Sequence, residues 1–244
     1  CASVLFMGVH LFSETKNDET KLIKCNFASG KVELIKKGSS GYSAISNLDI
    51  NSSLPQNSLL CTGEKSLCEL NLDSSIIIRS GSKSIIDSVN HKLLKVLSGS
   101  FLIYLKHDIE YTIQSKKSLL KTKGNYTAII DCTSNGGFKF IPLEGNGEMI
   151  SEEGGSKNIY RGRLTMVLGS PSKLGNAYDI DLLLLLKSSR LINSFPTPLP
   201  SMKRISLSIY AQQLRLKGKF NALIGDAPTD DNLQMWAFGE EDTK

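Results

Sequence analysis

Turn residues recur roughly every 8 to 12 positions through about the first 170 residues of this chain, and short apolar stretches lie between them. Residues 66–72 (SLCELNL) alternate apolar and polar side chains, which is the period of a half-buried strand. Two further stretches flank Asn135-Gly136, a dipeptide favoured in tight hairpin turns. We also expect a turn at 106–108 between two apolar stretches. The sequence therefore predicts an all-β, β-sandwich-like fold.

The pattern changes near residue 175. Residues 178–193 (YDIDLLLLLKSSRLIN) carry acidic side chains at their start and basic ones toward their end, an order that suits the helix dipole. Prolines within 196–200 would end such a helix. We predict one C-terminal helix at about 178–193, buried through its leucines. Residues 205–211 (ISLSIYA) alternate again and predict a further strand, before an acidic tail.

Residues 1–12 (CASVLFMGVHLF) have no acidic or basic side chain apart from His10, and they are too few for a membrane span of about 20 residues. We interpret residues 1–20 as the remnant of an export signal or membrane anchor followed by a polar linker. A lipidated Cys1 and a buried first strand are the alternatives. The first two interpretations predict an extracytoplasmic location, periplasmic or membrane-anchored. Residues 21–175 would then form the β domain and residues 176–244 a C-terminal extension.

The net charge of +5 is mild and its basic residues are scattered, without the alternating aromatic side chains of a nucleic-acid surface. The sequence contains no phosphate-binding glycine motif and no G-x-S-x-G nucleophile motif. His10, His91 and His107 have no carboxylate or cysteine at the spacing of metal ligands. These observations predict a protein that is not an enzyme and that holds no cofactor, no metal and no nucleic acid.

Carboxylates could still support glycoside hydrolysis, which needs two of them facing each other across a groove. Two clusters lie in regions that we expect to be loops, and solvent exposure is the alternative for both. Their members are Glu144, Glu148, Glu152 and Glu153 in the first cluster and Asp226, Asp230 and Asp231 in the second. Among the cysteines, Cys61 and Cys68 would lie on neighbouring strands, where they form either a cross-strand disulfide or buried free thiols.

The order of several short motifs resembles the FecR-type domain, an extracytoplasmic module of bacterial iron-citrate-type regulators. Residues 30–32 (GKV) resemble the start of that pattern, 62–66 (TGEKS) its turn after an apolar strand, and 69–72 (ELNL) its alternating strand. Residues 73–75 (DSS) stand where Asp-Gly-Ser is typical, and 97–100 (LSGS) match a later step. The resemblance covers about residues 24–150. Its motif residues are Gly30, Val32, Thr62, Gly63, Ser66, Leu70, Asp73 and Gly99.

This resemblance implies a β-sandwich-like module that binds a protein partner in the cell envelope and catalyses nothing. It also implies that the motif residues belong to the scaffold and do not contact a ligand. A carbohydrate- or peptidoglycan-binding envelope protein is the alternative function, and a glycoside hydrolase-like enzyme is a third.

Overall fold

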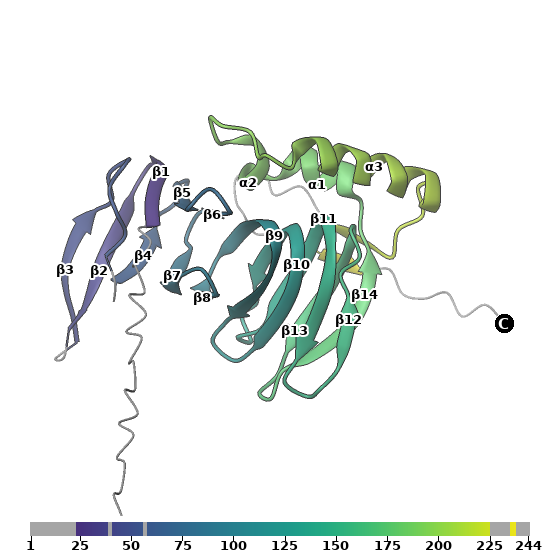
Figure 1. Ribbon diagram of the computed structural model, residues 1–244, viewed down its shortest axis with the longest axis horizontal. Coiled ribbons are helices and arrows are strands. Elements are labelled where there is room, and N and C mark those ends of the chain that lie inside the picture. The colour runs from purple at the N-terminus through teal and green to yellow at the C-terminus, as the bar shows by residue number, and fades with distance from the viewer. Residues whose placement is uncertain (1–22, 39–40, 56–57, 225–234, 238–244) are drawn as a thin grey trace, which may run out of the picture.

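The computed structural model describes residues 23–38, 41–55, 58–224 and 235–237, and it is built mainly from β-strands (Figure 1). Fourteen strands join one extended sheet assembly, in the order β1 (Ile23–Ser29), β2 (Val32–Gly38), β3 (Gly41–Asn47), β4 (Ser58–Thr62), β5 (Leu67–Leu72), β6 (Ile76–Ser80), β7 (Ile85–Val89), β8 (Leu93–Ser98), β9 (Ser100–Gln114), β10 (Leu119–Cys132), β11 (Phe138–Ser151), β12 (Ser156–Asn158), β13 (Arg163–Leu168) and β14 (Lys173–Asp179). The remaining elements are α1 (Leu182–Ser188), α2 (Arg190–Asn193), α3 (Met202–Leu216), β15 (Ala222–Ile224) and β16 (Met235–Ala237). The predicted all-β class is confirmed.

The three long strands β9, β10 and β11 form the centre of the sheet. The first half of β9 pairs with β6, which leads through β5 to β1. The second half of β9 pairs in parallel with β8, which leads through β7, β4 and β2 to β3. The two branches diverge from β9 and enclose a core between them, so the sheet becomes sandwich-like at this end.

Both faces of the central strands are buried, because successive side chains of a strand point to opposite faces. We call the apolar cluster between the two branches the sandwich core; Phe101, Ile103, Ile130 and Phe140 belong to it. The opposite face packs against α1, α2 and α3, and we call this cluster the layer core. It contains Leu102, Ile129 and Ile141 from the sheet and Leu185, Leu191, Ile205 and Ile209 from the helices.

Residues 182–216, which we call the helical layer, lie together on one side of β9, β10 and β11 (Figure 1). Asp181 starts α1, since its carboxylate accepts hydrogen bonds from the backbone N–H groups of Leu183 and Leu184 at 2.9 and 3.0 Å. The predicted leucine-rich helix is therefore present, and Leu182 and Leu185 are buried in the layer core. In the described ranges no helix is long and apolar enough to cross a membrane.

The predicted end of that helix agrees with the end of α2 at Asn193, but the predicted start was wrong and the helix is interrupted. Residues 178 and 179 belong to β14, because Asp179 completes the pairing with Arg163 on β13. The helix then breaks at Ser189, whose extended backbone (φ −74°, ψ 117°) separates α1 from α2. A run of leucines showed where a helix lies, but its ends depend on strand pairing and caps.

The strand predicted at 205–211 is wrong, because these residues lie inside α3. Serines at 206 and 208 produced the apparent alternation. In the structure each of these hydroxyls donates to the carbonyl four residues earlier, so the serines are satisfied within the helix. The turn predicted at 106–108 is also wrong, since β9 runs without a break from Ser100 to Gln114. The hairpin predicted at Asn135-Gly136 is confirmed, because it joins β10 to β11.

Candidate functional site

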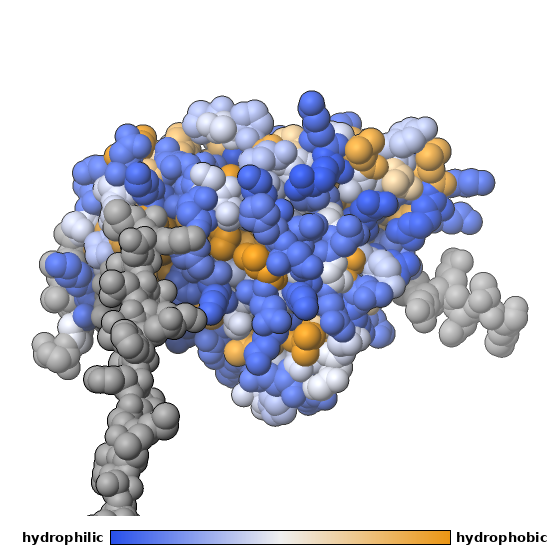
Figure 2. Space-filling model, in the orientation of Figure 1, coloured by the Kyte–Doolittle hydropathy of each residue, from blue (hydrophilic) through white to orange (hydrophobic). Residues whose placement is uncertain are grey.

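The outward face of α3 carries three large apolar side chains that no other described residue covers well. Leu207, Tyr210 and Leu214 are 67%, 65% and 62% exposed. Their spacing of three and four residues places them in one row along the helix. We call this row the α3 stripe, and Figure 2 shows apolar side chains on the surface where Figure 1 places α3. A row of exposed apolar side chains on one helix face is typical of a surface that binds a partner.

The opposite face of α3 is buried in the layer core, which fixes the outward direction of the stripe. Ile205 and Ile209 pack there against residues of the long strands and of α1. Burying two isoleucine side chains contributes roughly 3–6 kcal/mol. The helix is therefore apolar on two opposite sides, and among the described residues only one of these sides is packed against other elements.

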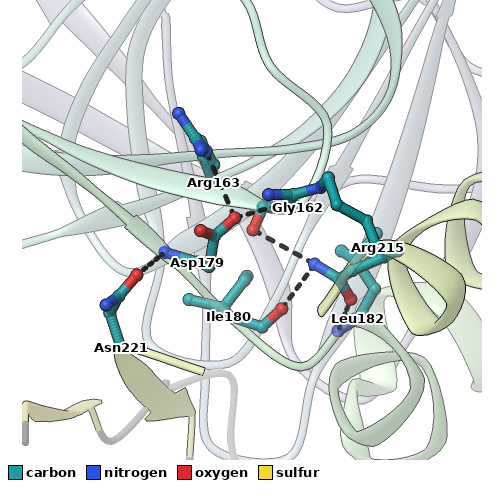
Figure 3. Close-up of polar contacts among 8 residues, drawn as sticks. Gly162, Arg163, Asp179, Ile180, Leu182, Arg215 and Asn221 are labelled. Atoms are coloured by element: carbon teal, nitrogen blue, oxygen red, sulfur yellow. Dashed lines mark hydrogen bonds and ion pairs between the residues drawn. The ribbon is translucent and has the colours of Figure 1, made fainter. Parts of the chain in front are cut away.

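Gln212 is a buried polar anchor between α3 and the sheet. Its amide nitrogen donates to the carbonyls of Gly162 and Ile180 at 3.3 and 2.7 Å, and its amide oxygen accepts from the backbone N–H of Leu182 at 3.1 Å (Figure 3). Gly162 has a positive φ of 75°, and a Cβ there would lie 2.2 Å from the Gln212 nitrogen. The close approach of loop and helix thus requires glycine at this position.

Asp179 is a second anchor, at the end of β14. Its carboxylate accepts from Arg163 at 3.2 Å and from Arg215 of α3 at 2.6 Å, while its backbone pairs with Asn221 (Figure 3). Burial tends to raise the pKa of Asp179, but the hydrogen bonds from Arg215 and Arg163 outweigh it and hold that pKa below its usual value. The anchor fixes the C-terminal end of α3.

Glu144 of β11 is the third anchor and holds the N-terminal end of α3. Its carboxylate accepts from Arg204 at 2.7 and 3.1 Å and from the hydroxyl of Thr127 at 2.6 Å. The Thr127 hydroxyl also bonds Ser201, immediately before α3. The hydrogen bond to Glu144 raises the pKa of the Arg204 guanidinium. Glu144 is buried, so this bidentate ion pair with Arg204 fixes the position of the first turn of α3.

Arg79 links the β6 strand to the loop after α2. It is 1% exposed, its Nε lies 2.8 Å from a carboxylate oxygen of Glu69, and its guanidinium donates to the carbonyls of Leu191 and Thr197 at 3.0 and 2.6 Å. The ring of Phe195 lies 4.3 Å from the guanidinium carbon. A fully buried arginine needs such a complete set of partners. Arg79 therefore fastens the helical layer to the sandwich.

The charge of residues 182–224 is one-sided, because they contain seven basic residues and no acidic one. Two of the basic side chains, Arg204 and Arg215, are paired with the anchors Glu144 and Asp179. Lys203 and Lys217, at the two ends of α3, are exposed. The α3 stripe is thus an apolar row with an exposed cation at each end.

The FecR-type motif residues lie in turns and strands of the sandwich. Gly30 has a φ of 75°, and a Cβ on it would lie 2.5 Å from the Ser66 hydroxyl oxygen. That oxygen accepts from the backbone N–H of Lys31 at 2.8 Å. Residues 30 and 66, which are far apart in sequence, thus form one joint between the β1–β2 turn and the start of β5.

A second joint forms around Thr62 and Gly99. The Thr62 hydroxyl donates to the carbonyl of Gly81 and accepts from the backbone N–H of Ser84 at 2.9 Å. Gly99 has a φ of 95°, and a Cβ there would lie 2.5 Å from the Cα of Ser84. The backbone N–H of Gly63 donates to the carbonyl of Lys31 at 2.8 Å and connects the two joints.

The remaining motif residues are Val32 and Leu70, both buried in the sandwich core, and Asp73 in the β5–β6 turn. Asp73 and Ser74 both have positive φ angles, 53° and 63°, as a type I′ hairpin turn requires. Ser74 therefore occupies a position where glycine is usual. The structure gives all eight motif residues contacts within the fold.

Of the predicted histidine and carboxylate candidates other than Glu144, Glu152 and His91 have structural partners, Glu153 and His107 are exposed, Glu148 is partly exposed, and the rest lie outside the described residues. Glu152 accepts from the backbone and the hydroxyl of Ser172, both at 2.8 Å, so it holds a turn. The Nε2 atom of His91 lies 3.2 Å from a carboxylate oxygen of Asp73. In the described part of the chain no three His, Cys, Asp or Glu side chains gather as a metal site would need. The predictions that fall outside the described residues concern the N-terminal segment 1–20, His10 and the acidic segment with Asp226, Asp230 and Asp231.

Comparison with known proteins shows only distant likeness. No family model matches the chain, and no curated protein matches it. Two crystal structures, each described as a candidate anti-sigma factor from Parabacteroides distasonis ATCC 8503, are similar at a TM-score of 0.38 and 7% sequence identity. Each alignment covers 48% of this chain and 57% of the neighbour, so the chain spans little more than half of that protein. A likeness at this level assigns neither fold nor function, and the FecR-type resemblance stays a prediction.

The α3 stripe was missed in the sequence. The signal that could have found it is the helical period of Ile205, Ile209 and Gln212, with a second row of apolar residues offset from the first. Reading 205–211 as a strand hid both rows, because alternation assigns every second residue to a single face.

Proposed function

We propose that this chain is a non-catalytic protein-interaction domain of the cell envelope, and that its partner docks on the α3 stripe. The stripe is the observation that carries the proposal: three apolar side chains stand exposed on a helix whose other side is fixed by three buried polar anchors. A helix held in this way cannot turn its stripe inward without breaking those anchors. The location in the envelope rests on the sequence of residues 1–20 and on the FecR-type resemblance.

The partner expected from the surface chemistry is an amphipathic segment with acidic flanks. Leu207, Tyr210 and Leu214 would contact its apolar side, and Lys203 and Lys217 its carboxylates. Exposed cations at the rim of an interface chiefly raise the association rate and make it sensitive to salt. Binding is thus expected to weaken as salt is added, while the apolar contacts retain a part of the affinity.

Two of the carboxylates considered for hydrolysis, Glu144 and Glu152, do not favour an enzyme. Glu144 is buried in the pair with Arg204, and Glu152 is bonded to Ser172. A glycosidase needs one carboxylate free to give a proton and a second free to attack or to activate water. Both glutamates instead complete structural contacts.

The test is a photo-reactive amino acid placed at position 210 of the full-length chain, followed by cross-linking in the envelope fraction of the source cells. We expect one protein to be captured repeatedly, and we expect the double variant L207S/L214S to lose it. I50S is the matched control, because Ile50 is an equally apolar residue exposed far from α3. Capture that persists in L207S/L214S, or that is lost equally in I50S, would contradict docking on the stripe.

Tyr160 favours the second candidate, a carbohydrate-binding envelope protein. It is half exposed, lies beside a groove of about 290 Å³ lined by Lys157, Asn158 and Arg163, and the guanidinium of Arg163 lies 5.5 Å from its ring centre. An exposed ring with hydrogen-bonding neighbours is suited to stack on a sugar. Binding to purified peptidoglycan that disappears in Y160A and persists in L207S/L214S would replace the protein-partner proposal with this one.

A further inference from the structure

Cys25 and Cys68 lie next to each other in the sandwich core, on the adjacent strands β1 and β5. Cys25 is opposite Leu70, and Cys68 stands two residues from Leu70 on the same face, so the two cysteines are diagonal neighbours across the strand pair. A β-bulge between Cys25 and Phe27 shifts the register at this point. Both side chains are completely buried. The disulfide partner considered for Cys68 in the sequence, Cys61, lies instead on β4 in the other branch of the sheet.

The two thiols interact with each other, and the interaction makes them unequal. The hydrogen bond with Cys68 lowers the pKa of Cys25, while the same contact and burial raise the pKa of Cys68 well above its usual value. Cys25 is thus the thiol that ionises first, and a thiolate is the form that attacks a disulfide. Burial raises the pKa of the other two described cysteines, Cys61 and Cys132, so these thiols are less reactive.

We propose that Cys25 and Cys68 form an oxidation site that closes to a disulfide and fastens β1 to β5. The oxidant is a disulfide, either a small molecule such as oxidised glutathione or a thiol–disulfide oxidoreductase. The Cys25 thiolate attacks one sulfur of the oxidant and forms a mixed disulfide, and the first oxidant thiolate leaves. Cys68 then loses its proton, and its thiolate attacks the Cys25 sulfur of the mixed disulfide and displaces the second oxidant thiolate. Two cysteine thiols give up two protons and two electrons, and the oxidant becomes two thiols.

The position of β1 explains both the access and the effect. Among the described strands β1 pairs only with β5, and on its other side it contacts the irregular segment 51–54. An edge strand opens more readily than a central one, so an oxidant reaches the thiols when β1 separates or before it has docked. A diagonal pair closes after a small movement of the backbone. Once formed, the bond prevents β1 from leaving the sheet.

The experiment is a peptide map of the full-length protein refolded with a mixture of reduced and oxidised glutathione, trapped with iodoacetamide and digested with trypsin without reduction. We expect the peptides 25–31 and 66–79 to be joined and to separate after reduction. The joined protein should unfold at a higher temperature than the reduced protein. C61S is the matched control and should keep the link, whereas C68S should lose it.

Two results would overturn the proposal: a link that joins Cys61 to another cysteine as the main product, or free thiols at both Cys25 and Cys68 after complete refolding in the oxidising mixture. The map of the unsubstituted chain decides this even where C68S fails to fold. The chemistry does not involve α3, so its failure would leave the docking proposal standing, and the loss of the docking partner would leave this site standing.

Discussion

Ile129 and Ile130 are neighbours on β10, both completely buried, yet they pack in different cores. Ile130 lies in the sandwich core, where the branches of the sheet meet through apolar side chains. Ile129 lies in the layer core, which is surrounded by the anchors Gln212, Glu144 and Asp179. Hydrophobic packing is strong but non-directional, whereas hydrogen bonds impose a geometry. The comparison suggests that the sandwich supplies stability and that the anchors orient α3.

The buried charges follow the same division. Five charged side chains are buried in the described part of the chain: Glu69, Arg79, Asp131, Glu144 and Asp179. All of them except Asp131 hold the helical layer, either directly or through a partner. Burying an ion pair gives little net stability, but breaking one is costly. The helical layer is therefore sensitive to substitutions that remove one partner of a buried ion pair, whereas the sandwich core contains few such pairs.

Arg79 gives the largest predicted effect. R79M should lower the free energy of unfolding by about 3–5 kcal/mol, because Glu69 is left buried without its cation and the carbonyls of Leu191 and Thr197 lose their donor. Urea denaturation followed by circular dichroism measures the change. In the double variant R79M/E69M no charge remains buried, so we expect a part of the loss to be recovered. A double variant less stable than R79M would show that the cost comes from packing and not from the isolated carboxylate.

Ile129 and Ile130 allow a direct test of whether the two cores unfold together. I129A and I130A remove the same atoms from the two faces of one strand, and each should cost about 2–5 kcal/mol. Both should show a single transition in urea with an unchanged slope. If I129A costs less than half as much as I130A, or adds a second transition, the helical layer unfolds as a separate unit.

The sandwich could be predicted from sequence because its signals are local. Alternation, turn residues and the Asn135-Gly136 pair each act over a few positions, and the strands that they predict within the sandwich are present, unlike the one predicted at 205–211. The continuity of β9 through 106–108 could not be predicted, because it depends on pairing with β10 along its whole length. Three consecutive polar residues look like a turn until a neighbouring strand is known.

The candidate site could not be predicted for a related reason. Arg79 finds its backbone partners more than a hundred positions away, and Gln212 bonds groups that are 30 to 50 positions distant. No local pattern announces such contacts. The stripe itself becomes visible only when the inward side of α3 is known, since a helix with two apolar sides shows no simple polar face.

Asp179 gives a smaller effect that depends on pH. Its pKa is held below the usual value in the folded state, so its contribution is present above the unfolded pKa of about 3.9 and is lost as pH falls through the folded pKa. D179N should therefore lower the free energy of unfolding by about 1 kcal/mol at neutral pH and leave it unchanged in acid. The effect is small because the two arginines are partly exposed. Denaturation curves recorded from pH 7 downward measure this.

D131N is the matched control with the opposite sign. Burial raises the pKa of Asp131 despite its bonds to Lys139 and Ser100, so the folded state binds its proton more tightly than the unfolded state. The stability contributed by Asp131 then falls as pH rises. As pH rises, the free energy of unfolding of D131N should increase relative to the unsubstituted protein, and that of D179N should decrease. Parallel slopes would contradict the assignment of Asp179 as an anchor by charge.

Ser74 gives the smallest predicted effect and returns to the hairpin that carries the Glu69–Arg79 pair. The two residues are directly opposite on β5 and β6, and the turn at Asp73 and Ser74 sets that register. S74G should raise the free energy of unfolding by about 0.5–1 kcal/mol, because glycine adopts a positive φ without the strain that serine has there.

S75G is the matched control for S74G. The φ of Ser75 is not positive, so glycine brings no relief there and should be neutral or mildly destabilising. S74G should also give the same gain in the R79M background, because the turn and the guanidinium share no partner and their effects should add. A gain that vanishes in R79M would mean that the turn acts through the buried ion pair. The hairpin would then help to hold the helical layer through Arg79, although its apolar residues lie in the sandwich core.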